Sequence, residues 1–127
     1  MDIQIKHLKV GDETILEHVA IDVFDETIDP HYLASYLAEP THHMIIAINE
    51  TEVVGQIRAI IHKHPDRPDE LYIDNLGVTP TLQRQGIATK LLNAINKTVV
   101  KKLGWQLSVI IPKRKDFMNL TVSKLNQ

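Results

Sequence analysis

A turn between two apolar segments is the part of this sequence best suited to chemistry. The turn reads Gln83-Arg84-Gln85-Gly86, and from Ile87 apolar residues recur at helical spacing through Leu91 and Ile95. A helix that begins here presents free backbone N–H groups and the positive end of its dipole, and Gly86 leaves room for an anion beside the backbone. The turn is therefore predicted to bind a phosphate group.

The common phosphate-binding loops of other kinds do not match this turn. It lacks the Gly-Lys-Ser/Thr of a Walker loop, and it lacks the Gly-x-Gly of a dinucleotide-binding fold. The alternative interpretation is an ordinary strand-to-helix turn whose glycine starts the helix.

The elements that would position the turn follow an α/β order. Leu71 to Val78 is a short apolar run ended by Pro80, which predicts a strand directly before the turn. These patterns predict one domain over 1–127 with a mixed sheet that is flanked by helices. Its N-terminal strands are expected to be antiparallel, and the two strands around the central helix are expected to be parallel. The other predicted elements are strands within 2–9 and over 43–49, 52–62 and 105–111, and helices over 12–24, 30–38 and 117–125, with Gly104 ending the central helix.

Length and composition narrow the class of protein. A chain of 127 residues can bury a core without disulfides or metal. The formal net charge of −2 gives no electrostatic signature of a nucleic-acid binder, and no nucleic-acid partner is expected. The chain has no cysteine and no run that approaches the roughly 18 apolar residues of a membrane span. A cytoplasmic protein without membrane contact is therefore the default expectation.

Residues 71–92 resemble the GNAT superfamily of N-acetyltransferases. That family carries Gln/Arg-x-x-Gly-x-Gly/Ala after its fourth strand, and Gln83, Gly86 and Ala88 occupy the three defined positions. The order of the predicted elements also matches the family, so the resemblance covers most of the chain. Within the family, the segments Tyr36-Leu37-Ala38-Glu39-Pro40, Val53-Val54-Gly55 and Leu71-Tyr72-Ile73 are most similar to aminoglycoside 3-N-acetyltransferases.

The resemblance implies transfer of an acetyl group from acetyl-CoA to a primary amine of a small molecule, such as an aminoglycoside-like one, or of a peptide. In the family the pantetheine arm of CoA lies beside the fourth strand, which implies cofactor contacts at Leu76, Gly77 and Val78. The Val78 N–H would face the thioester oxygen. The pyrophosphate would meet the backbone amides of Arg84, Gln85, Gly86, Ile87, Ala88 and Thr89.

An amine acceptor is mostly protonated at neutral pH, so the implied reaction needs a base, and a carboxylate is expected. Asp74 and Glu70 are the candidates, and strand alternation predicts that Asp74 shares a face with Tyr72 and Leu76. The aminoglycoside enzymes carry their strand aspartate one position later, where this chain has Asn75; such an offset reverses the face unless a bulge intervenes. The alternative is that Asp74 lies at a bulge or at the edge of a hairpin, where backbone N–H groups donate hydrogen bonds to its carboxylate.

Two departures from the family pattern concern the last residues of the sequence. The family carries a tyrosine there as the proposed general acid, whereas Val122 precedes Ser123-Lys124-Leu125-Asn126 here. The family also continues through two more strands, so we expect a fold that lacks them. The resulting apolar edge over 105–111 predicts a homodimer. The alternative function is a catalytically weak module that binds CoA or an acyl-CoA.

Histidines and acidic residues give weaker indications. His42 and His43 face opposite ways on a strand, and His62 and His64 flank a loop, so no metal site is expected, because metal ligands must converge. Two acidic clusters lie in regions that flank the acceptor site of the family and would suit a cationic acceptor. Their members are Asp22, Asp25, Glu26 and Asp29 in one cluster and Asp66 and Asp69 in the other.

Overall fold

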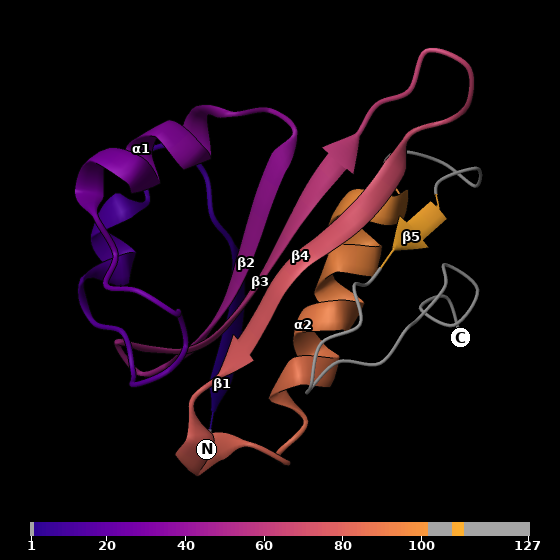
Figure 1. Cartoon of the computed structure of the whole chain (residues 1–127). Coiled ribbons are helices and arrows are strands. Elements are labelled where there is room, and N and C mark those ends of the chain that lie inside the picture. The colour runs from indigo at the N-terminus through magenta and orange to yellow at the C-terminus, as the bar shows by residue number, and fades with distance from the viewer. Residues whose placement is uncertain (1, 102–107, 111–127) are drawn as a thin grey trace.

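A five-stranded sheet is formed by the residues that this computed structural model describes, 2–101 and 108–110 (Figure 1). The strand order is β1-β2-β3-β4-β5, with antiparallel pairing from β1 to β4. β5 pairs parallel with the first three residues of β4. The strands are β1 (Ile3–His7), β2 (His42–Asn49), β3 (Glu52–His62), β4 (Glu70–Val78) and β5 (Ser108–Ile110).

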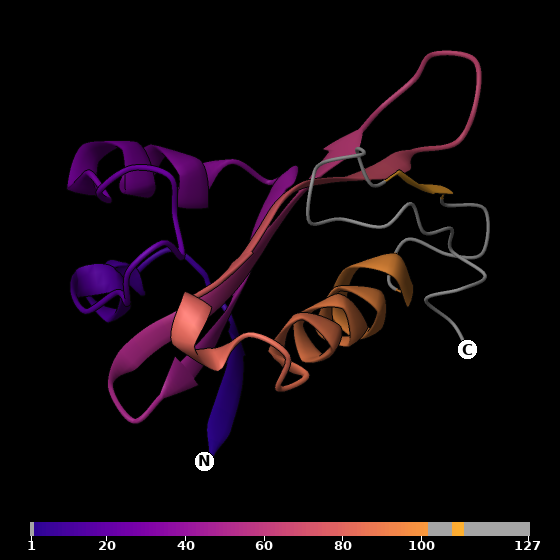
Figure 2. The ribbon, with the colours of Figure 1, turned by 60° about the horizontal axis from the view of Figure 1, so that its bottom comes forward.

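Helices cover both faces of the sheet (Figure 2). α1 (Pro30–Ala38) and the short 3₁₀ helix η1 (Glu13–Glu17) lie on one face, and α2 (Ile87–Ile95) lies on the other. α2 continues into a π-helical turn, η3 (Asn96–Val100). Because both faces are covered, apolar side chains are buried along β2 without alternation.

The core has one layer on each side of the sheet. On the α2 face, Ile87, Leu91 and Ile95 pack against strand residues that include Ile45, Ile57, Leu71 and Ile73. On the α1 face, the buried residues are Leu8, Leu16, Val23, Leu33, Met44, Ile46, Ile48 and Val53.

The predictions for the central elements are confirmed. β2 and β3 form the predicted hairpin, and β4 begins one residue earlier than predicted, at Glu70. α1 begins where the sequence places its cap, because the Asp29 carboxylate accepts hydrogen bonds from the backbone N–H groups of His31 and Tyr32 at 2.8 and 3.1 Å. Of the predicted strand over 105–111 only Ser108–Ile110 is described, and Gly104 and the predicted helix over 117–125 lie outside the described residues.

The predicted helix over 12–24 is wrong. Only Glu13–Glu17 is helical; His18 is extended, and residues 21–26 form turns and bends. The Val53 N–H donates to the His18 carbonyl and the Ala20 N–H donates to the Val53 carbonyl, both at 2.8 Å. Bonds to β3 thus replace the bonds that a helix would make within itself. The apolar pattern still marked buried positions, since Leu16 and Val23 both enter the core.

β4 contains a bulge at Asp74. Arg58 pairs with Asn75 and Ala59 pairs with Ile73, which leaves Asp74 as the extra residue. Leu76 therefore packs on the α2 face, as Ile73 does. The predicted shared face of Asp74 and Leu76 is wrong, because the bulge interrupts the alternation on which the prediction relied.

Residues 18–24 cross β4 at Gly77. A Cβ atom at Gly77 would overlap the Val23 carbonyl oxygen and would lie 3.3 Å from Gln56 Nε2. The Cβ side of Gly77 thus faces the chain's own backbone. The cofactor contact that the resemblance implies at Gly77 stays a prediction.

No helix in the described part of the chain is long and apolar enough to cross a membrane.

The crossing at Gly77 gives a prediction for stability. Gly77→Ala should lower the free energy of unfolding by about 1–3 kcal/mol, because a backbone carbonyl must move to admit the methyl group. Gly55→Ala is the matched control, since its Cβ would meet the Ile87 and Leu91 side chains at 3.1 and 3.3 Å and a backbone oxygen, that of Gly77, only at the ordinary contact distance of 3.4 Å. Urea unfolding of both variants checks this, and an equal loss in the two would contradict the argument.

Candidate functional site

The turn after β4 leaves an open approach to the start of α2. Gly86 is left-handed (φ 81°), and no atom lies within 4 Å of the position that its Cβ would occupy. Arg84 is left-handed as well (φ 66°), and Gln85 beside it is exposed. The Lys90 N–H donates to the Gly86 carbonyl at 3.0 Å, so the amides of residues 87–89 precede the helical ladder. The backbone therefore offers an accessible cradle for an anion, as predicted for a phosphate group.

Gln83 attaches this turn to β4. Its Nε2 donates to the Val78 carbonyl at 3.1 Å. The short 3₁₀ helix η2 (Pro80–Leu82) lies between the two residues, so the side-chain bond closes a compact loop. The sequence motif marked Gln83 but not this bond, because a motif does not specify which carbonyl an amide will reach.

β4 has a free edge along its second half. β5 pairs with residues 70–72, and no described residue pairs with 73–78 on that side of β4. The Thr79 N–H donates to the Val54 carbonyl on β3 at 2.9 Å. Backbone alternation therefore directs the N–H groups of Leu76 and Val78 away from β3, toward the free edge. An extended ligand could pair there, and the anion cradle follows directly along the chain.

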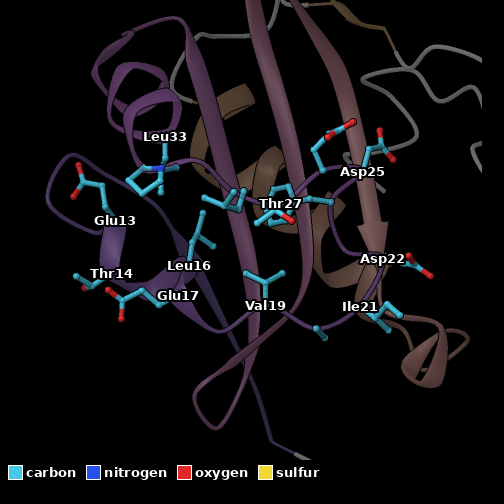
Figure 3. Close-up of a pocket in the computed structure, with 15 residues that line it drawn as sticks. Glu13, Thr14, Leu16, Glu17, Val19, Ile21, Asp22, Asp25, Thr27 and Leu33 are labelled. Carbon is cyan, nitrogen blue, oxygen red and sulfur yellow. The ribbon is translucent and has the colours of Figure 1, made fainter.

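Two cavities lie on the face of the sheet that carries α1. The larger, of about 690 Å³, lies between η1 and the segment 19–28, and the smaller, of about 340 Å³, lies between 24–29, α1 and Arg58. Figure 3 shows Asp22 and Asp25 at one end of the larger cavity and Glu13 and Glu17 at the other. The acidic residues that line one or both cavities are Glu13, Glu17, Asp22, Asp25, Glu26 and Asp29.

The Asp74 carboxylate influences residues on the face of the sheet that carries α1 and the two cavities. Burial raises the pKa of Tyr36 above its ordinary range, while Arg58 lowers this pKa and Asp74 raises it. The Tyr36 hydroxyl donates to the His43 carbonyl at 3.0 Å, and the Arg58 guanidinium lies 5.9 Å from the centre of the Phe24 ring. Tyr36 and Arg58 both line the smaller cavity. The exposed carboxylate of Asp74 is therefore close enough to this cavity wall to act on it electrostatically.

Glu70 lies apart from this region. Its Oε1 is 2.5 Å from His64 Nε2 and 3.6 Å from the Arg67 guanidinium. Asp74 lies four positions along the strand from Glu70, a distance of roughly 13 Å. The structure thus does not bring the two predicted catalytic carboxylates together.

Comparison with known proteins decides the family. Residues 12–108 match the sequence profile of the acetyltransferase (GNAT) family. The chain belongs to this family. Its members are acetyltransferases that use acetyl-CoA.

Solved structures share the fold of this GNAT chain. One is an aminoglycoside acetyltransferase from an uncultured soil metagenomic sample, with TM-score 0.72 and 18% identity over 94% of this chain and 84% of that one. Another is AAC(6')-Iy with a bisubstrate analogue that joins CoA to acetylneamine, with TM-score 0.68 and 16% identity over 91% and 82%. A third is the ribosomal-protein-alanine N-acetyltransferase of Brucella melitensis biovar Abortus 2308, with TM-score 0.69 and 14% identity over 91% and 82%. No curated protein matches the chain in sequence.

The cradle at Gly86 gives a prediction for cofactor affinity. Gly86→Val should weaken acetyl-CoA binding at least tenfold, about 1.4 kcal/mol, because a branched side chain would fill the space that a phosphate group needs. Gly11→Val is the matched control: Gly11 is also left-handed (φ 101°) with no atom within 4 Å, so the backbone strain is similar. Isothermal titration with acetyl-CoA measures both, and equal affinity in the two variants would exclude a phosphate site here.

Proposed function

We propose that this protein transfers the acetyl group of acetyl-CoA to a primary amine of a small polycationic molecule, of the aminoglycoside kind. The carrying observation is that the segment which lines the larger acidic cavity packs on β4 at Gly77, in the half of the strand that has a free edge. Asp22 and Phe24 line the larger cavity and flank Val23, whose carbonyl crosses β4 at Gly77. Gly77 lies between the two residues whose N–H groups face the free edge.

Leu76 and Val78 would bind the cofactor through their backbone. An extended pantetheine arm could pair with their N–H groups as an added strand does. The bond from Gln83 to the Val78 carbonyl fixes the orientation of that part of β4. A single preoriented donor such as the Val78 N–H, placed where the thioester oxygen gains negative charge, contributes about 3–4 kcal/mol in comparable acyl-transfer sites.

The acidic cavities would bind the acceptor. Each additional ammonium group of a polyamine is attracted by the carboxylates that line the cavities, and such a field raises the local concentration of cations. The bisubstrate analogue in the AAC(6')-Iy structure joins CoA to an acetylated amino sugar, so a similar fold accommodates both partners at once.

Asp74 is our candidate for the base. The bulge places its carboxylate in solvent beside the cavity wall, whereas Glu70 is already bonded to His64. Asp74 would take a proton from the acceptor ammonium, directly or through water. The freed amine then forms the new N–C bond to the acetyl carbon as the C–S bond breaks. The nitrogen loses a second proton as the amide forms, and the leaving thiolate takes up one proton, so the products are the amide and the CoA thiol.

The homodimer expected from the apolar edge over 105–111 remains a prediction.

Other acceptors fit the family. The third similar structure is named for a protein acceptor, the alanine of a ribosomal protein. The acidic lining of the cavities favours the polycation over a peptide terminus, whose amino group carries at most one positive charge. The catalytically weak CoA-binding module is the remaining alternative.

A panel of acceptors tests the proposed function. Release of CoA thiol should be at least tenfold faster, as kcat/KM, with a neamine-type aminoglycoside or a linear polyamine than with a peptide that begins with alanine. The advantage should shrink at high ionic strength, because salt screens the cavity charges. A preference for the peptide would overturn the polycation proposal. Acetyl-CoA binding without thiol release from any amine would favour the weak module.

The base assignment is tested separately. Asp74→Asn should lower kcat roughly 100- to 10,000-fold at neutral pH, the usual contribution of a positioned base, without changing acetyl-CoA affinity. Glu70→Gln should change kcat far less, because its carboxylate lies about 13 Å along the strand. Comparable losses in both variants, or full activity in Asp74→Asn, would assign the base elsewhere.

A further inference from the structure

Three side chains that can ligate a metal converge at the end of the β3–β4 hairpin. One ligand atom from each of His62, His64 and Glu70 lies within 4.8 Å of the other two. The ring centroids of His62 and His64 are 4.4 Å apart, and His64 Nε2 is 2.5 Å from Glu70 Oε1. The sequence-based expectation of no metal site assumed that the loop separates these histidines, but the structure brings them together.

Paired backbone holds this cluster. His62 is the last residue of β3, Glu70 is the first residue of β4, and the two are cross-strand partners. An ion pair between Lys63 and Asp69, 3.0 Å from Nζ to Oδ2, joins the next residues of the hairpin. Figure 1 shows this hairpin extending beyond the other strands of the sheet. Two of the ligands therefore come from strand ends, which positions them better than a long free loop would.

The exposure of the cluster suits an ion that enters from solvent. The side chains of His64 and Glu70 are 11% and 20% exposed, while His62 is exposed. Two ligands are thus shielded from competing water and the third leaves an entry path. Lys63 and Arg67 are positively charged residues of the same hairpin, but Arg67 is 61% exposed and 3.6 Å from Glu70, so its side chain can swing away.

We propose that His62, His64 and Glu70 bind one divalent first-row transition-metal ion, with a fourth position open to solvent. Two imidazoles and one carboxylate are the protein ligands of several zinc sites, and this set favours Zn²⁺ or Co²⁺ over Mg²⁺ or Ca²⁺. Zinc bonds of about 2.0–2.2 Å place tetrahedral ligand atoms roughly 3.4 Å apart. The His64–Glu70 contact must open slightly and the wider separations must close by about 1 Å. The inference does not depend on the acetyl-transfer proposal, in which Asp74 is the base.

Titration of the full chain, without a polyhistidine tag, tests this proposal. Isothermal titration with Zn²⁺ should give one site per chain, and Co²⁺ should give the visible absorption bands of a four- or five-coordinate ion. His62→Ala, His64→Ala and Glu70→Gln should each weaken Zn²⁺ binding by more than the roughly 10- to 100-fold typical of losing an outer-sphere partner. His18→Ala, an exposed histidine outside the cluster, should bind as the unmodified protein does.

A second histidine pair provides the discriminating control. His7 Nε2 lies 3.2 Å from His43 Nδ1. This pair lies on β1 and β2, away from the β3–β4 hairpin in the strand order, so His7→Ala should leave Zn²⁺ affinity unchanged. Thermal unfolding without metal identifies any variant that has lost its fold. If His64→Ala is unstable, His62→Ala still tests the proposal, because the His62 side chain is exposed and its removal should leave the fold intact. The proposal is overturned by absence of Zn²⁺ binding, by retained affinity in His62→Ala and Glu70→Gln, or by loss of affinity in His7→Ala.

Discussion

One buried side-chain amide connects the segment that lines the cavities to the strand with the free edge. Gln56 is fully buried, and its Nε2 donates to the Val23 carbonyl at 3.1 Å and to Asn75 Oδ1 at 2.6 Å. Each bond adds only about 0.5–1.5 kcal/mol net, but a buried donor left without a partner costs about 1–3 kcal/mol. The position of Val23 over β4 is therefore tightly specified. With no side chain at Gly77, the crossing backbone can come this close.

This connection has a consequence for how the two substrates could meet. β4 would present its edge to acetyl-CoA, and the segment that crosses it lines the acidic cavities where an acceptor would bind. A shift of Val23 would change the cavity wall and the neighbourhood of Leu76 and Val78 together. In this arrangement, the relative placement of cofactor and acceptor depends on the core of the protein and on one buried amide, more than on the exposed side chains of the cavities.

The sequence predicted most elements because their signals are local. The cap at Asp29, the hairpin of β2 and β3, and the glycine turn before α2 each depend on neighbouring residues and were placed correctly. The apolar spacing predicts a helix over 12–24 because it reflects burial, but β3 supplies hydrogen-bond partners for His18 and Ala20, and turns and bends follow over 21–26. Likewise the approach of His62 to His64 and the bond from Gln83 to Val78 depend on tertiary geometry, which spacing does not encode.

The bulge at Asp74 shows why one extra residue matters for the chemistry. Before it, Leu71 and Ile73 face α2; after it, Leu76 and Val78 do. Without the extra residue, strict alternation would turn Asn75 toward the apolar α2 layer and Leu76 toward the acidic cavities. The bulge keeps apolar side chains on the α2 face in both halves of the strand. It also leaves a carboxylate in solvent on the opposite side, at the place where β4 changes from an edge paired with β5 to a free one. A residue that cannot join the ladder is thereby available for proton transfer, and the strand retains its packing on both sides.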